Sequence, residues 1–311
     1  MIKHLLSIDQ LSVEQIELVL KTADSFREVG TRVIKKVPAL RGRTVCNLFF
    51  EPSTRTRLSF ELAAKRLSAD VINFTADSKT SISKGESFKD TALTLQAMGL
   101  DIIVVRHTSG GAAKRLSQWV DAGVVNAGDG SNEHPTQALL DLYSIREHLG
   151  GLEGLRIGIV GDIAHSRVAR SNVKAMTKMG AEVVAIGPPT LLPPTLSSWG
   201  VDVSSDLDDV LPKLDVVYLL RVQTERQSEQ FFPSLREYAT HWGLDRRRVG
   251  MLKPEALIMH PGPINRGVEI SSELADHARS IIAEQVTNGI AVRAALLYLM
   301  LGGQPEIEVT R

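Results

Sequence analysis

The segment 53–57 has the residue types of an anion-binding site. It reads Ser-Thr-Arg-Thr-Arg and follows the apolar run 44–50 after Glu-Pro. At the start of a helix, hydroxyls and backbone N–H groups bind a dianionic phosphate, and guanidinium groups add charge-assisted hydrogen bonds. Simple capping by Ser53 or Thr54 would explain the hydroxyls alone. Cations are disfavoured at the positive end of a helix, so the pair Arg55 and Arg57 favours a bound anion over a plain cap.

A second group able to take part in chemistry is His134, which opens the segment His-Pro-Thr-Gln ending at Gln137. Proline is favourable in the first turn of a helix, so His134 is expected beside a helix start. Its imidazole should stay largely neutral there and donate a hydrogen bond. For a single histidine, a capping or core role is the alternative. The remaining histidines show no spacing typical of a metal site, so we predict no metal.

Arg106, Arg167 and Arg221 form a third set, because each lies at or just after the end of an apolar run that predicts a β-strand. Open α/β sheets bind their ligands beyond the carboxyl ends of the strands. Guanidinium groups pair bidentately with carboxylates and phosphates. Together with Arg55, these arginines predict a cleft for a multiply charged anion.

Other motifs argue against a nucleotide-dependent enzyme. The run 158–162, Gly-Ile-Val-Gly-Asp, lacks the complete glycine pattern of dinucleotide-binding folds, and a tight strand-to-helix turn explains it. The sequence has no Gly-x-x-x-x-Gly-Lys-Ser/Thr loop, so ATP-driven ligation is not expected. The run 246–248, Arg-Arg-Arg, is isolated and is interpreted as solvated surface. We therefore expect no cofactor.

Charge and cysteine content narrow the class of protein further. Lys plus Arg is 36 and Asp plus Glu is 36, and this balance argues against nucleic acid as the main partner. The single cysteine, Cys46, excludes an intrachain disulfide and lies in an apolar run, which favours a core position over a nucleophile. Neither a bilayer-spanning apolar stretch nor a signal peptide is evident, so we expect no membrane partner and a cytoplasmic location.

The elements that must position these residues alternate between strands and helices. A capping box at Ser12 and Gln15 opens a first helix, expected to reach about Phe26. The further expected elements are strands at 44–50, 71–74, 101–105, 156–160, 182–186, 216–220 and 256–259, and helices at 58–67, 87–98, 134–149, 166–179 and 290–301. Such alternation predicts an α/β fold of doubly wound parallel sheets covered by helices. A length of 311 residues allows two such domains, with a junction near Gly150.

The motifs together resemble the carbamoyltransferase superfamily. The resemblance lies in Phe-Glu-Pro-Ser-Thr-Arg-Thr-Arg at 50–57 and His-Pro-Thr-Gln at 134–137. Similarity to the aspartate carbamoyltransferases within it is carried by the segments 81–86, 221–226 and 260–263. The last of these reads His-Pro-Gly-Pro, whereas ornithine carbamoyltransferases carry His-Cys-Leu-Pro there. The resemblance covers essentially the whole chain in order.

The resemblance implies that the chain transfers the carbamoyl group of carbamoyl phosphate to the amine of L-aspartate. The products would be N-carbamoyl-L-aspartate and phosphate, in pyrimidine biosynthesis. An ornithine or acylated ornithine acceptor is one alternative, and a catalytically silent assembly subunit is another. A catalytic role is implied for Arg55, Thr56, Lys84, Arg106 and His134. Substrate contacts are implied for these five and for Ser53, Thr54, Ser81, Gln137, Arg167, Arg221, Gln223, Pro261, Gly262 and Pro263.

The resemblance also implies how the chain is organised. Residues 1–135 plus 288–311 would form a carbamoyl phosphate-binding domain and residues 136–287 an aspartate-binding domain, with the active site in the cleft between them. The expected assembly is a homotrimer whose sites are shared between subunits, because Ser81 and Lys84 would reach into a neighbour's site. The family also allows a larger holoenzyme with regulatory or dihydroorotase-like chains.

Overall fold

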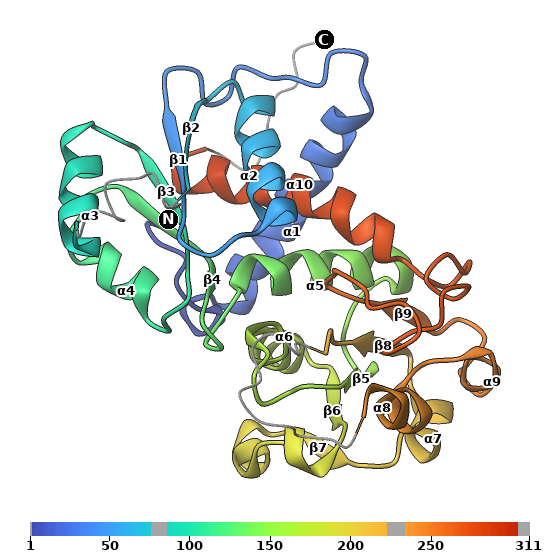
Figure 1. Cartoon of the computed structure of the whole chain (residues 1–311). Coiled ribbons are helices and arrows are strands. Elements are labelled where there is room, and N and C mark those ends of the chain that lie inside the picture. Colours follow the sequence, from blue (N-terminus) through green and yellow to red (C-terminus); the bar gives the residue numbers. More distant parts are fainter. Residues whose placement is uncertain (1, 76–85, 223–233, 304–311) are drawn as a thin grey trace. The chain divides into compact units, whose positions relative to one another are not determined.

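The computed structural model describes residues 2–75, 86–222 and 234–303 of the chain (Figure 1). The chain divides into two compact units, one made of Met1–Tyr143 with Val286–Arg311 and the other of Ser144–Gln285. The division passes through two helices, α5 (Pro135–Leu149) and α10 (Ile282–Met300). Each unit has a parallel sheet of its own, which confirms the predicted α/β fold with two parallel sheets.

The first unit is built on a four-stranded sheet in the order β2-β1-β3-β4, with every neighbouring pair parallel. Parallel strands need long crossovers, and helices supply them here. In chain order the elements are η1 (Ile8–Gln10), α1 (Val13–Thr31), β1 (Thr44–Phe49), α2 (Thr54–Arg66), β2 (Asp70–Thr75), α3 (Phe88–Ala97), β3 (Ile102–His107), α4 (Ala112–Ser117), β4 (Gly123–Asp129), α5 and α10.

Alternate residues of β1 and β3 point to opposite faces of this sheet, and both faces are buried. One face packs Cys46, Leu48 and Ile103 against apolar side chains of α3 and α4. Figure 1 shows α1, α2 and α10 on the other side of the same strands. The predicted core position of Cys46 is confirmed, since its side chain is buried.

The second unit is a five-stranded parallel sheet in the order β7-β6-β5-β8-β9. Leucines and valines of α7, η5 and α9 pack on one face, and α6 lies on the other side of the sheet in Figure 1. Its elements are β5 (Arg156–Val160), α6 (Arg167–Lys178), β6 (Glu182–Ile186), η3 (Pro189–Leu191), η4 (Pro194–Trp199), β7 (Asp202–Ser204), α7 (Leu207–Val210), η5 (Leu211–Lys213), β8 (Val216–Leu219), α8 (Leu235–Trp242), α9 (Arg246–Val249) and β9 (Leu257–Met259).

Two boundaries and two missed elements differ from the expectation in ways that matter for the site. Helix α2 begins at Thr54 instead of residue 58, so the segment 53–57 forms its N-cap and first turn. Strand β3 continues to His107, which places Arg106 inside a strand instead of after one. Strand β4 and helix α4 were not predicted, because four glycines and four alanines interrupt the apolar pattern over residues 110–128.

The interpretation of the run 246–248 as solvated surface is wrong for Arg248. Its guanidinium is buried, and it donates to Asp208 Oδ1 at 2.6 Å and to the carbonyls of Gly243 and His241. A buried arginine needs partners for most of its donors, and Asp208 of α7 and the C-terminal end of α8 supply them. Within the described ranges, no helix combines the length and the apolarity that a membrane span requires.

Candidate active site

The sheet of the first unit has a topological switch point between β1 and β3. The chain moves from β1 outward to β2 and then returns to β3 on the other side of β1. Ligands of open α/β sheets bind at such points, beyond the carboxyl ends of the strands. Phe49 at the end of β1 is paired with Arg106 in β3, and the N–H of Phe50 donates to the Arg106 carbonyl. The segment 53–57 and Arg106 therefore meet at this edge.

The first turn of α2 has backbone N–H donors that the Ser53 side chain does not cap. Ser53 is the N-cap residue, but its side chain makes no capping hydrogen bond. Ser12 at the start of α1, by contrast, accepts from the Gln15 N–H in the expected capping box. The Ser53 hydroxyl is therefore not used for capping. In the first turn, Thr56 is buried and Arg55 is exposed.

Arg106 is nearly buried at the switch point and is held in a defined orientation. It donates to Glu51 Oε1 at 2.8 Å and to the Ala127 carbonyl of β4 at 3.1 Å. A buried charge is tolerated when a counter-charge and hydrogen bonds compensate it. Glu51 lies in the loop between β1 and α2, so Arg106 links that loop to two neighbouring strands.

His134 follows two buried acidic residues, Asp129 at the end of β4 and Glu133. Asp129 accepts hydrogen bonds from the backbone N–H groups of Gly111 and Glu133. Glu133 in turn accepts from the Ser7 hydroxyl at 2.7 Å and from the Ile8 N–H at 3.0 Å. These contacts fix the loop that presents His134, which is buried beside Pro135 at the start of α5. Sequence reasoning missed both acids, although each is a carboxylate in a largely uncharged stretch.

Gln137 lies in the first turn of α5, as expected. Its amide Nε2 donates to Asp141 Oδ1 at 3.1 Å, one turn further along the helix. Both side chains are buried. This contact orients the amide, so that its carbonyl oxygen keeps a fixed direction.

His107 at the end of β3 has its pKa lowered by burial, against the opposing influence of Asp129 and Glu51. Its ring lies against Phe50 and Phe88, and its Nδ1 accepts from the Ser109 N–H at 2.9 Å. The lowered pKa favours a neutral ring, and Nδ1 already accepts a hydrogen bond. His107 therefore packs against the aromatic side chains at this sheet edge and does not serve as an acid.

The second unit repeats this arrangement with a switch point between β5 and β8. Arg167 is the first residue of α6, after the N-cap Ser166, and it is buried. Arg221 is half-buried and comes two residues after the end of β8. Because β5 and β8 are neighbours, both arginines lie at one edge of the same sheet. Two guanidinium groups at one edge suit a ligand with two carboxylates.

The segment 260–263 follows β9, the next strand of this sheet, and buried groups hold it. The His260 ring accepts from the Gly262 N–H through Nδ1 at 2.8 Å, so its proton lies on Nε2 and points to Glu269 Oε1 at 3.2 Å. Glu269 also accepts from the Asn265 N–H. Pro261, Gly262 and Pro263 therefore lie in a braced loop at the same edge as Arg221.

The structure thus gathers the predicted residues at two sheet edges, one in each unit. Three further predicted residues, Ser81, Lys84 and Gln223, lie outside the described residues. In the described part of the chain, no cluster of three or more His, Cys, Asp or Glu side chains could hold a metal ion.

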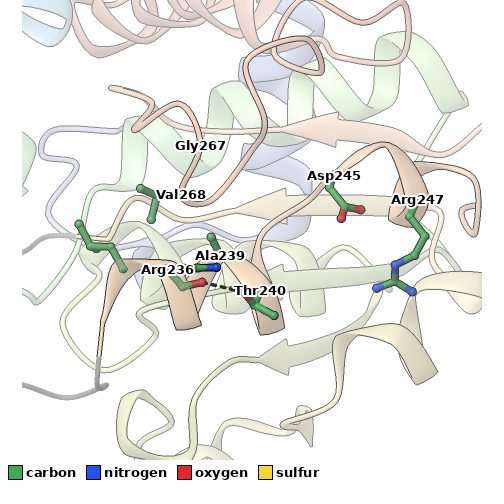
Figure 2. A pocket seen from close by; sticks show the side chains of 8 residues that line it. Arg236, Ala239, Thr240, Asp245, Arg247, Gly267 and Val268 are labelled. Atoms are coloured by element: carbon green, nitrogen blue, oxygen red, sulfur yellow. Dashed lines mark hydrogen bonds between the residues drawn. The ribbon is translucent and has the colours of Figure 1, made fainter.

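A cavity of about 590 Å³ lies on the second unit, between α8, the start of α9 and the loop at Gly267 (Figure 2). It is open, and Arg247 on its wall is paired with Asp208 at 2.7 Å. The Thr240 hydroxyl is bound to the Arg236 carbonyl within α8. None of the predicted site residues lines it, so size alone does not make it the active site.

Comparison with known proteins agrees with this geometry. Residues 3–147 match the family described as "Aspartate/ornithine carbamoyltransferase, carbamoyl-P binding domain", and residues 153–300 match "Aspartate/ornithine carbamoyltransferase, Asp/Orn binding domain". The chain belongs to the aspartate/ornithine carbamoyltransferase family. The expected resemblance is therefore confirmed.

Individual relatives resemble the chain over nearly its full length. It is 61% identical over 301 residues to the aspartate carbamoyltransferase catalytic subunit of Thermobifida fusca, covering 97% of this chain and 96% of that protein. The corresponding subunit of Acidothermus cellulolyticus is 59% identical, with coverages of 97% and 94%.

Two solved structures share the fold. The catalytic subunit of M. jannaschii aspartate transcarbamoylase matches with a TM-score of 0.84 and 37% identity, over 96% of this chain and 98% of that one. The Trypanosoma cruzi enzyme in complex with N-(phosphonacetyl)-L-aspartic acid matches with a TM-score of 0.85 and 30% identity, over 95% and 94%.

Proposed function

We propose that this chain transfers the carbamoyl group of carbamoyl phosphate to the amine of L-aspartate, giving N-carbamoyl-L-aspartate and phosphate. The observation that carries the proposal is the match, over almost the whole chain, to catalytic subunits of aspartate carbamoyltransferase. The arginines at the edge of the second sheet support aspartate as the acceptor. The positively charged side-chain amine of ornithine would need acidic partners instead.

In the proposed reaction, the first turn of α2 binds the phosphate through the hydroxyls of Ser53 and Thr54, the backbone N–H groups and the Arg55 guanidinium. Lys84 and Ser81 of the segment 81–86 complete the phosphate site. The Ser53 side chain is suited to this role because it does not cap its own helix. Gln137 and the backbone at Pro261, Gly262 and Pro263 orient the carbamoyl group and the incoming amine.

The neutral amine attacks the carbonyl carbon, and the tetrahedral intermediate carries an oxyanion. We assign its stabilisation to Thr56, Arg106 and His134, and donors of this kind are worth roughly 3–4 kcal/mol each. Phosphate then leaves with the electrons of the C–O bond, and Arg55 and Lys84 compensate its growing charge. The leaving phosphate accepts the amine proton. Arg167, Arg221 and Gln223 hold the two aspartate carboxylates.

The domain roles, the assembly and the location belong to the same proposal. Residues 1–135 with 288–311 would bind carbamoyl phosphate and residues 136–287 aspartate. We propose a homotrimer in the cytoplasm. Exposed apolar side chains on the first unit support an assembly surface, since Leu58 and Leu62 on α2 and Ile72 on β2 are 49%, 39% and 40% exposed.

Steady-state turnover decides the proposal. The purified chain should consume carbamoyl phosphate with L-aspartate and release equimolar phosphate and N-carbamoyl-L-aspartate. Ornithine and N-acetylornithine serve as the matched acceptors in the same assay. Turnover with either of these and none with aspartate would contradict the proposal. Absence of turnover with all three acceptors would favour a catalytically silent assembly subunit.

A further inference from the structure

A buried arginine of α10, Arg293, lies behind the phosphate-binding helix without belonging to the predicted site. Its side chain is only 4% exposed, and burial lowers its pKa to about 10, so it remains charged at neutral pH. A buried cation is costly unless its surroundings compensate it. The contacts that it makes therefore deserve an explanation beyond packing.

On one side, Arg293 contacts α2. Its Nη1 donates to the Ser59 hydroxyl at 2.6 Å, and its guanidinium carbon lies 5.1 Å from the centre of the Phe60 ring. Ser59 is buried and follows Thr56 by three residues, so both lie on the same buried face of the helix. Arg293 thus holds the turn that directly follows the proposed phosphate-binding turn.

On another side, Arg293 faces α5. The Asp141 carboxylate attracts its charge and opposes the fall of its pKa. Asp141 is fully buried and accepts from the Gln137 amide at 3.1 Å, one helical turn before it. The charge of Arg293 is therefore attracted to α5, the helix that begins directly after His134 and carries Gln137.

The chain leaves space for this arrangement at Gly289, one turn before Arg293 on α10. A Cβ atom there would lie 2.7 Å from Arg293 Nη1 and 3.1 Å from Leu140 of α5. A glycine inside a helix destabilises it relative to alanine, so it needs a structural reason. Here it lets the guanidinium and α5 approach the backbone of α10.

We infer that Arg293 is a positioning residue for the transfer reaction. It sets the first turn of α2 and the Gln137 amide relative to each other without touching substrate. This inference rests on the proposed function. Misplacing catalytic groups by about 1 Å can cost roughly 100-fold in rate.

The test compares Arg293→Met, Arg293→Lys and Ser59→Ala with a matched control, Arg248→Met. Arg248 is also a buried arginine, but it lies in the second unit and binds Asp208 and two carbonyls. Arg293→Met should lower kcat by roughly 10- to 100-fold. Ser59→Ala should lower it several-fold, and Arg293→Lys should recover part of the loss. Arg248→Met should lower the Tm while kcat and KM stay within about twofold.

A double-mutant cycle between Arg293→Met and Gln137→Ala separates positioning from a general loss of stability. If Arg293 acts through Gln137, the two losses in kcat will be clearly less than additive. Additive losses, or wild-type kcat in both Arg293→Lys and Ser59→Ala, would overturn the inference even if Arg293→Met fails to fold. Wild-type turnover with aspartate is measured first, because its absence would defeat the proposed function instead.

Discussion

Cys46 shows how burial alone sets the chemistry of a side chain in this protein. It lies in β1, and burial raises the pKa of its thiol from an ordinary 9.0 to about 12. The thiolate is the reactive form, so the folded chain should not react with a thiol reagent at pH 8. Titration with an aromatic disulfide reagent should detect no thiol in buffer and one per chain in denaturant. Rapid labelling of the native protein would contradict the burial.

The same shift makes stability depend on pH. Between pH 9.0 and about 12 the unfolded thiol loses its proton while the folded thiol keeps it. The unfolded state then binds fewer protons, so the free energy of unfolding falls as pH rises through this window. We expect the difference in unfolding free energy between wild type and Cys46→Ala to be constant below pH 9 and to shrink above it. A constant difference up to pH 11 would argue against the shift.

His134 is the residue whose proposed role is specific to the transition state. Its oxyanion contact would strengthen as the tetrahedral intermediate forms, so His134→Ala should act mainly on kcat. Loss of one such donor typically costs roughly 100- to 1000-fold in kcat. Steady-state kinetics in both substrates measures the effect. An increase in KM with kcat unchanged would exclude the oxyanion role.

At the scale of elements, two serines at helix starts should behave differently. Ser12 caps α1 through its side chain, whereas Ser53 begins α2 without a capping bond. Ser12→Ala should therefore cost about 1 kcal/mol of stability and leave activity unchanged. Ser53→Ala should change stability little and weaken phosphate binding. Denaturant unfolding and titration with inorganic phosphate measure the two effects, and a Ser53→Ala variant with wild-type phosphate affinity would exclude this serine from the site.

The elements also explain why two edges carry the candidate residues. In each sheet the chain reverses its direction of strand addition, between β1 and β3 and between β5 and β8. Side chains after these neighbouring strands must lie close together, whatever their separation along the chain. The switch points therefore bring arginines that are far apart in the sequence together in two groups, one at each sheet edge.

At the scale of the whole molecule, the proposed trimer makes a prediction about mixed assemblies. If Lys84 completes the site of a neighbouring chain, Arg55→Ala and Lys84→Ala trimers should each be almost inactive. Dissociating and reassembling the two together can form sites with Arg55 from one chain and Lys84 from another, both intact. Activity should reappear in the mixture.

The control for this experiment is each variant dissociated and reassembled by itself, which should stay inactive. If Arg55 and Lys84 served the same site from one chain, every mixed site would lack one of them. A mixture that remains inactive although mixed trimers are detected by native mass spectrometry would therefore exclude the shared site.

Much of this protein follows from sequence patterns that act over short distances. The boundaries of β5 and β6 and the capping box of α1 coincide with the expectation. Apolar runs, cap residues and glycines act through neighbours within a few positions, so they are readable along the chain. The residue types of the segment 53–57 and of His134 likewise indicate anion chemistry without any knowledge of the fold.

Only the tertiary structure decided which charged groups are buried and what they contact. Glu51 after β1 contacts Arg106 in the neighbouring strand β3, and Arg248 is enclosed by Asp208 and the C-terminal end of α8. Ser59 contacts Arg293 across 234 positions of the chain. Strand β4, interrupted by small residues, became recognisable only as a partner of β3. Such contacts depend on strand order and helix packing, which bring together segments far apart in the chain. A short stretch of sequence cannot determine them, because the stability of a buried charge depends on partners from elsewhere in the fold.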